Sequence, residues 1–82
     1  MASMSGRRPK RRILLNAPVA WDRMDPRNLS QNQLADLLGC SSSHLSRVFN
    51  GTRCPSPALR QRMQEELGAG FEELFIVEEF ND

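Results

Sequence analysis

LSQNQLADLLGCSSSHLSRVFN, residues 29–50, carries two short apolar stripes at helical spacing with a glycine between them. Ser30 precedes the first stripe, and its hydroxyl can accept a hydrogen bond from the free amides of a first helical turn. Gly39 follows the stripe, where a residue without a β-carbon most easily takes the left-handed conformation that ends a helix. This pattern predicts a helix over about 31–38 and a turn directly after it. The apolar residues of this stripe are Leu34, Ala35 and Leu38.

A second helix is predicted over 41–49, with Ser41 as its N-terminal cap. Its inner stripe consists of Leu45, Val48 and Phe49, and its outer face of Ser42, Ser43, Ser46 and Arg47. Two short helices joined by a tight turn form a helix-turn-helix. A small polar face that carries one guanidinium can enter a major groove of DNA.

The motifs LSQNQLADLLG, HLSRVFNG and GAGFEELF together resemble the lambda-repressor and Cro-like (Xre-type) family of phage and bacterial regulators. The resemblance covers roughly residues 29–75. It implies an all-α, compact fold of four to five helices with the helix-turn-helix at 30–50. It also implies a sequence-specific regulator of transcription, a repressor from a phage or mobile element, that binds double-stranded operator DNA and needs no cofactor.

The resemblance also assigns roles to individual residues. Gln31 matches the family glutamine that clamps the DNA backbone, although it could simply begin a helix. Asn50 matches a phosphate-binding asparagine, and Arg47 can either donate two bonds to guanine or contact a phosphate. Arg53 lies in a loop that the family uses for both backbone and bases. The complete set of expected DNA contacts in this part of the chain is Ser30, Gln31, Ser41, Ser42, Ser43, Ser46, Arg47, Asn50, Thr52 and Arg53.

A basic segment, RRPKRR at residues 7–12, precedes the helices. It has no apolar content, so we expect it to be disordered when free. It could be a solubilising tail, but lambda-like repressors extend a basic arm around the duplex. We therefore expect residues 1–12 to form a flexible arm and 13–82 to form the DNA-binding domain. The arm residues expected on DNA are Arg7, Arg8, Lys10, Arg11 and Arg12.

Two further helices are expected on either side of the central pair. Pro18 is tolerated only in a first turn, and Pro26 disfavours a helical conformation of the residue before it, so the first helix should run from about 17 to 25. Ser56 and Pro57 suit the start of another helix, which Gly68 should end. Leu59, Met63 and Leu67 supply its core stripe.

The segment 71–80 is apolar on too many sides for a surface helix of a monomer. It resembles the fifth helix through which lambda-like domains form symmetric pairs, so it is a possible dimerisation element. Phe71, Leu74 and Phe75 could instead close the monomer core. The expected interface residues are Ile76, Val77 and Phe80.

Bulk properties limit the remaining classes of protein. Eighty-two residues allow one domain, and no apolar run approaches the length of a membrane span. All eleven lysines and arginines lie at or before Arg62, whereas seven of the ten acids follow it. We therefore expect the part of the chain up to Arg62 to bind a polyanion and the acidic C-terminal part to repel it. Cys40 and Cys54 do not have metal-ligand spacing; we expect a core thiol at Cys40 and an exposed loop residue at Cys54. A cytoplasmic, nucleoid-associated protein of a bacterium or phage-infected cell is expected.

No arrangement of residues predicts catalysis. His44 has no acid three or four residues away to orient its ring, and the paired acids diverge on a helix. We therefore expect a protein that is not an enzyme. Two alternatives stay open: an antitoxin-like or other protein-interaction module that uses the apolar C-terminal segment, and an architectural or recombination factor that bends DNA with little base preference.

Overall fold

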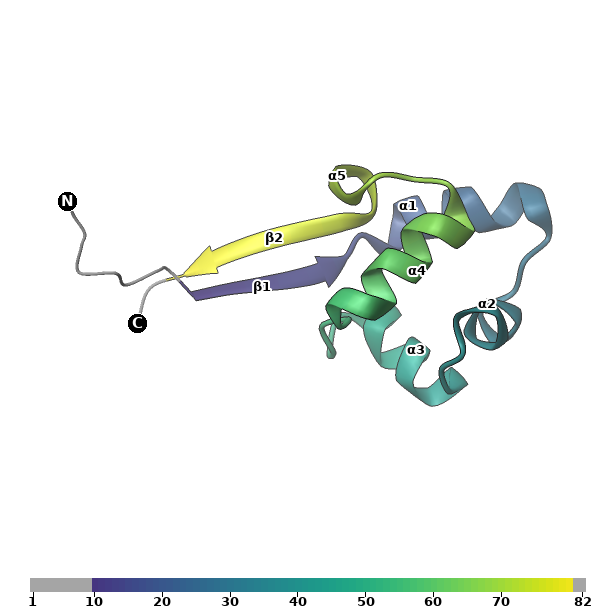
Figure 1. The fold of residues 1–82 in the computed structure, drawn as a ribbon, viewed down its shortest axis with the longest axis horizontal. Helices are drawn as coiled ribbons and strands as arrows, with labels where there is room; N and C mark the ends of the chain where they lie inside the picture. Colours follow the sequence, from purple (N-terminus) through teal and green to yellow (C-terminus); the bar gives the residue numbers. More distant parts are fainter. Residues whose placement is uncertain (1–9, 81–82) are drawn as a thin grey trace.

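The computed structural model describes residues 10–80 and confirms a mostly helical fold (Figure 1). The helices gather into one body, and a two-stranded ribbon projects from one side of it. In chain order, the elements are β1 (Lys10–Leu15), α1 (Ala17–Met24), the 3-10 helix η1 (Asp25–Arg27), α2 (Gln31–Leu38), α3 (Ser42–Asn50), α4 (Pro57–Leu67), α5 (Phe71–Leu74) and β2 (Phe75–Phe80).

Local capping fixes both ends of α2. The Ser30 hydroxyl accepts a hydrogen bond from the Gln33 amide at 3.1 Å, and the Gln33 side chain accepts one from the Ser30 amide at 2.8 Å. This reciprocal capping box satisfies two amides that a helix start would otherwise leave unpaired. At the other end, Gly39 has φ +74°, and a β-carbon there would lie 3.2 Å from the Arg62 guanidinium. The positive φ favours glycine here, and a β-carbon would also force the Arg62 guanidinium to move by a few tenths of an ångström.

The next two helices begin in the predicted manner. Ser41 caps α3 by accepting from the His44 amide at 3.1 Å, and Ser56 caps α4 by accepting from the Leu59 amide at 3.2 Å. Pro57 occupies the first position of α4. Here its missing amide hydrogen costs nothing.

One hydrophobic core lies between the helices and the base of the ribbon. The predicted stripes of α2, α3 and α4 all point into it, and α1 contributes Ala20 and Met24. Trp21 packs against Phe49 with ring centroids 5.1 Å apart, which joins α1 to the C-terminal end of α3. The largest fully buried side chains are Met24, Leu34, Leu38, Leu45, Val48, Met63 and Leu74.

The N-terminal prediction was wrong for residues 10–12, which are not disordered. Lys10–Leu15 form β1, which pairs antiparallel with β2. Arg12 donates to Glu78 at 2.6 Å and Arg11 lies 3.9 Å from Glu79, so opposite charges face one another across the ribbon. The ribbon therefore includes residues 10–12 of the expected arm. Arg7 and Arg8 lie outside the described residues.

The C-terminal segment 71–80, which resembles the fifth helix of the family, is helical only in part, since α5 ends at Leu74 and Phe75 begins β2. Leu74 and Phe75 are buried and close the monomer core. Phe71 is half-buried, with its ring centroid 5.3 Å from that of Phe75. The continuation as a strand follows from β-branched and aromatic residues that find a partner strand in β1.

Two smaller expectations are also adjusted. The first α-helix ends at Met24, but Asp25 keeps helical angles and starts η1 in spite of Pro26. Cys40 is half-buried at the edge of the core, and burial raises the pKa of its thiol. Cys54 is exposed, as predicted.

Candidate nucleic-acid interface

The outer face of α3 is open and bears no carboxylate. Leu45 and Val48 anchor the helix in the core, which leaves Ser42, Ser43 and Arg47 exposed on the opposite side. The predicted serine face is therefore present, although Ser46 is half-buried. Small hydroxyl side chains allow close approach of another surface, and the one guanidinium supplies two parallel donors.

A shallow hollow joins α3 to the N-terminal turn of α2. Its lining consists of Gln31, Asn32, Ser42, Ser43, Ser46 and Arg47, all of which are uncharged or basic. The first amides of α2 point out of the helix here and place a partial positive charge beside the hollow. Asn32 was missed by the sequence analysis; its signal was its position directly after Gln31 in the first turn of α2.

Most arginines of the helical body are used inside the protein. Arg62 donates to the Leu38 carbonyl at 2.8 Å, at the C-terminus of α2. Arg27 donates to the Glu66 carbonyl near the end of α4. Arg60 lies over the Phe71 ring, 5.9 Å from its centroid.

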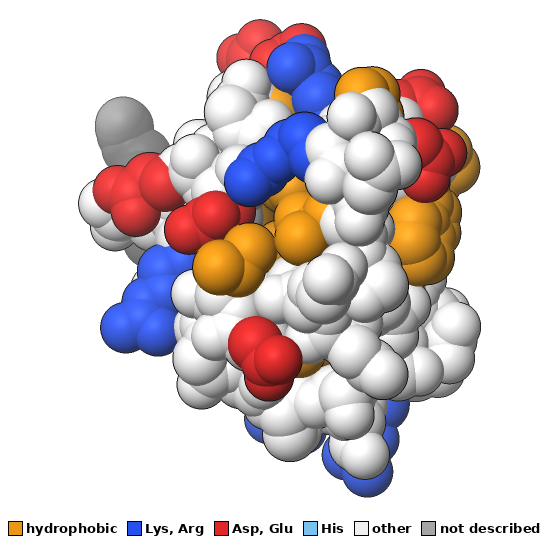
Figure 2. Space-filling model, turned by 90° about the vertical axis from the view of Figure 1, so that its right-hand side faces the viewer, with side chains coloured by type: hydrophobic (Ala, Val, Ile, Leu, Met, Phe, Trp, Pro, Cys, Tyr) orange, Lys and Arg blue, Asp and Glu red, His pale blue; other side chains and the backbone are white. Residues whose placement is uncertain are grey.

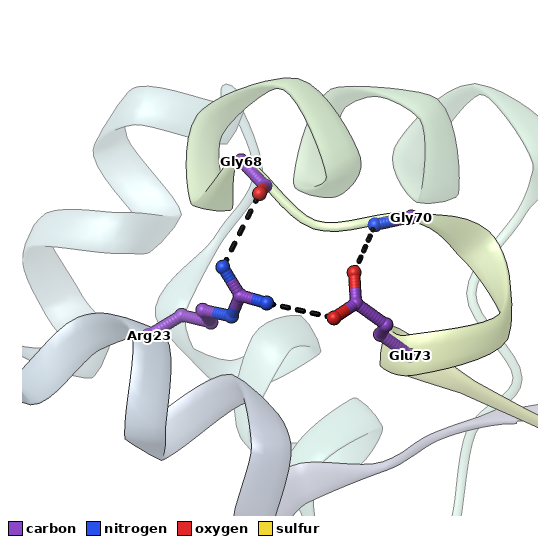
Figure 3. Close-up of polar contacts among 4 residues, drawn as sticks. All are labelled: Arg23, Gly68, Gly70 and Glu73. Carbon is purple, nitrogen blue, oxygen red and sulfur yellow. Dashed lines mark hydrogen bonds and ion pairs between the residues drawn. The ribbon is translucent and has the colours of Figure 1, made fainter.

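Arg23 bridges α1 to the C-terminal end of α4 and to α5 (Figure 3). Its guanidinium donates to the Gly68 carbonyl at 3.3 Å and to the Glu73 carboxylate at 2.8 Å. The other oxygen of Glu73 accepts from the Gly70 amide at 2.9 Å. This hydrogen bond from the Gly70 amide, together with the nearby Arg23 charge, lowers the pKa of Glu73.

Arg47 and Arg53 differ from these arginines. Within residues 10–80, neither guanidinium has a hydrogen bond, an ion pair or an aromatic contact, and both residues are exposed. Arg47 lies on the outer face of α3 and Arg53 in the loop that follows it. Two unpaired cations therefore lie close together along the chain, on and directly after α3.

Figure 2 views the end of the body that lies opposite the ribbon. Acidic and basic side chains intermingle over its upper half, and uncharged surface covers most of its lower half. Lysine or arginine side chains reach the lower edge, at the level where Figure 1 places α3. One acidic side chain lies in the lower half, between this edge and the mixed charges above it.

Several predicted contacts also have structural roles. The hydroxyls of Ser30 and Ser41 cap helices, and the Thr52 hydroxyl donates to the Arg47 carbonyl at 3.2 Å. A capping serine accepts with its oxygen, so its own hydrogen is still available to an anion. Asn50 is exposed at the last position of α3.

The arm and interface residues that were predicted meet on the ribbon. Arg11 and Arg12 face acids of β2, and Lys10 pairs in register with Phe80. Ile76 and Val77 are 46% and 37% exposed. Phe80 ends β2, and its side chain is outside the described part of the structure.

The family model named HTH_3, described as a helix-turn-helix, matches residues 20–74, more than half of the chain. Among solved structures, the chain is similar to the transcriptional regulator VanUg with a TM-score of 0.62 and 15% sequence identity. That similarity covers 95% of this chain and 99% of the other. At this identity it shows a shared fold. No curated protein matches the chain.

None of the helices within residues 10–80 has the length and apolar content needed to cross a bilayer.

Proposed function

Because the chain belongs to the helix-turn-helix family HTH_3, we propose that it is a transcription regulator that binds double-stranded DNA with α3 in the major groove. The observation that carries this proposal is the outer face of α3, which is free of acids and carries the unpaired guanidinium of Arg47 beside exposed serines. A convex helix of this width fits the major groove, and its side chains can bond to base edges there.

Contacts to the DNA backbone place α3 in register. Gln31 and the first amides of α2 bind a phosphate on one side of the groove, where the helix dipole favours an anion. Asn50 and Arg53 bind phosphates near the C-terminal end of α3. These contacts supply affinity and orientation, whereas base contacts supply specificity.

Arg47 is the principal reader of sequence in this proposal. Serines accept from and donate to several bases, so Ser42 and Ser43 discriminate weakly. A guanidinium can bond to both acceptors of guanine, and a good contact of this kind is worth about 1 to 3 kcal/mol of discrimination. The absence of an internal partner for Arg47 within residues 10–80 supports this role, because the side chain loses no protein contact on binding.

The regulator acts as a symmetric pair of copies on an operator of a phage or mobile element. Two recognition helices about 34 Å apart meet successive major grooves, which explains why such proteins bind sites with two half-sites. The exposed apolar residues Ile76 and Val77 support pairing through the C-terminal segment.

The test is selection from a random duplex pool at near-physiological salt, with Arg47→Ala beside the wild-type protein. We expect a motif with two half-sites one helical turn apart, relaxed at one base in each half-site by Arg47→Ala. Arg60→Ala is the matched control, because it removes the same charge from α4 and should leave the motif unchanged. Salt-sensitive binding without a motif would replace the proposal with an architectural role. Absence of binding would favour a protein-interaction module.

A further inference from the structure

A second hollow lies between the turn that joins α2 to α3 and the N-terminal half of α4, and the proposed reading of DNA does not use it. Its volume is about 260 Å³. Because a water molecule takes up about 30 Å³ of liquid, the hollow has room for a molecule of about nine non-hydrogen atoms. None of its lining residues is an acid. The lining residues that matter here are Leu38, Cys40, His44, Ser56, Leu59 and Arg62.

Arg62 supplies positive charge to the hollow. Its guanidinium donates to the Leu38 carbonyl at 2.8 Å. A guanidinium has five N–H donors, so others are left over. Arg23 and Arg27 also donate to carbonyls near helix ends, but each of them has a glutamate partner as well. Arg62 has no such carboxylate within residues 10–80, so its charge is available to a ligand.

Two further polar side chains border the hollow beside Arg62. The Ser56 hydroxyl accepts from the Leu59 amide at 3.2 Å, which leaves its own hydrogen free to donate. The His44 side chain is half-buried and makes no hydrogen bond in the described part of the chain. Imidazole, hydroxyl and guanidinium can therefore all donate to the same ligand oxygens.

The remaining wall is largely apolar. Leu38 and Leu59 are buried, and the half-buried Cys40 lies between the two helices that these leucines come from. A site with one charged group and apolar walls suits a ligand with a charged head and a compact apolar body. A carboxylate matches the planar guanidinium best, because it can accept two parallel hydrogen bonds.

We propose that this hollow binds a small organic carboxylate, with its charged head on Arg62 and its apolar body against Leu38 and Leu59. His44 belongs to the first turn of α3, so the bound negative charge lies against the reading helix. Charges interact over about 8 Å at physiological ionic strength, and the ligand therefore lowers the affinity for DNA phosphates. Only this effect on DNA rests on the proposed function; binding of the carboxylate does not.

Benzoate is a probe of suitable size, and benzamide is its neutral counterpart of nearly the same shape. Cys40 lines the hollow, so a bound ligand should restrict access of a thiol reagent to it. At ten times the dissociation constant of benzoate, modification of Cys40 should slow about elevenfold, because only the unoccupied protein reacts. Benzamide at the same concentration and ionic strength should leave the rate unchanged. Cys54 is exposed outside the hollow and is the internal control, followed in the same digests by mass spectrometry.

Variants of α4 test the role of the charge. Arg62→Gln keeps a donor for the Leu38 carbonyl but removes the guanidinium, and benzoate should no longer protect Cys40. Arg60→Gln is the matched control, because it removes the same charge from a residue that lies over the Phe71 ring. Circular dichroism establishes that both variants fold. If Arg62→Gln does not fold, the comparison of benzoate with benzamide in the wild-type protein decides the question.

Fluorescence anisotropy with a duplex that carries one half-site measures the effect on DNA. Benzoate should weaken binding by the wild-type protein at least twofold relative to benzamide, and DNA should weaken benzoate by the same factor. Protection of Cys40 together with unchanged DNA affinity would overturn the effect on DNA and leave the carboxylate site standing. A protein that binds benzoate but no duplex would contradict the proposed function and support the site.

Three results would overturn the carboxylate site. The rate at Cys40 could be the same with and without benzoate, which would show that the hollow is not occupied. Equal protection by benzamide would show an apolar hollow that does not recognise charge. Protection by the duplex but not by benzoate would assign the hollow to a phosphate of the DNA backbone.

Discussion

Neutralising the acids of the ribbon should make DNA binding more dependent on salt. Glu78 and Glu79 face Arg12 and Arg11 at 2.6 and 3.9 Å. A basic segment held in this way is already partly neutralised before it meets DNA. In the double variant Glu78→Gln, Glu79→Gln, the carboxylate charges that face these two guanidinium groups are removed, which favours contacts of the ribbon with phosphates.

The cost to folding is small. The four side chains are 45% to 60% exposed, and exposed ion pairs contribute about 0 to 1 kcal/mol each because water and salt screen them. The base of the ribbon is held by Leu15 and Phe75, which are buried. The double variant should therefore stay folded, with β1 still paired to β2.

The gain on DNA follows from counterion release. Each new phosphate contact adds about 0.9 to the slope of log affinity against log salt, so two contacts add about 1.8. Between about 50 and 200 mM salt, the variant should lose roughly twelvefold more affinity than the wild-type protein.

Fluorescence anisotropy with a labelled duplex that carries one half-site measures this slope without a contribution from pairing. The control is Glu65→Gln with Glu72→Gln, which makes the same change in net charge at exposed acids outside the ribbon. Equal slopes for the two double variants would refute the reasoning, because the effect would then come from net charge and the ribbon arginines would not reach the DNA.

Three further predictions concern stability and reactivity. Ser30→Ala removes the hydroxyl acceptor of the α2 capping box and should cost about 1 kcal/mol, seen as a lower urea midpoint with an unchanged m-value; an unchanged midpoint would contradict this. The pKa of Glu73 is lower in the folded than in the unfolded state, so its stabilising effect is present above the ordinary carboxyl pKa of about 4.3 and is lost as the pH falls through the folded value. Urea titrations between about pH 3 and pH 6 should therefore show less acid destabilisation for Glu73→Gln than for the wild-type protein, and parallel curves would argue against the contact with Arg23. A thiol reagent at neutral pH should modify Cys54 before Cys40, because Cys54 is exposed and burial raises the pKa of Cys40; mass spectrometry of the digested protein would reveal the opposite order.

The count of basic residues in the sequence was a poor guide to which of them are available to DNA. Arg23, Arg27 and Arg62 cap carbonyls at helix ends, and the ribbon arginines face acids. Each of these roles joins residues far apart in the chain, so composition alone could not separate them from Arg47 and Arg53. The structure describes both of those arginines without such partners.

The sequence by itself determined the helices and their order. Ser30, Ser41 and Ser56 cap helices through the amide three residues later, and Gly39 ends α2 in the left-handed conformation. These interactions act over three or four residues, which is the range that a local pattern contains. The apolar stripes of these helices predicted the core for the same reason.

Only the tertiary structure decided the conformation of residues 10–15 and 75–80. The segments KRRILL (β1) and FIVEEF (β2) form strands because they pair with each other. The pairing joins residues as distant in the chain as Arg12 and Glu78, which are 66 residues apart. A strand has no internal hydrogen bonds, so its stability depends on a partner that the local sequence does not specify. The helices bond within themselves and could be predicted, whereas the ribbon depends on a contact between the two ends of the folded domain.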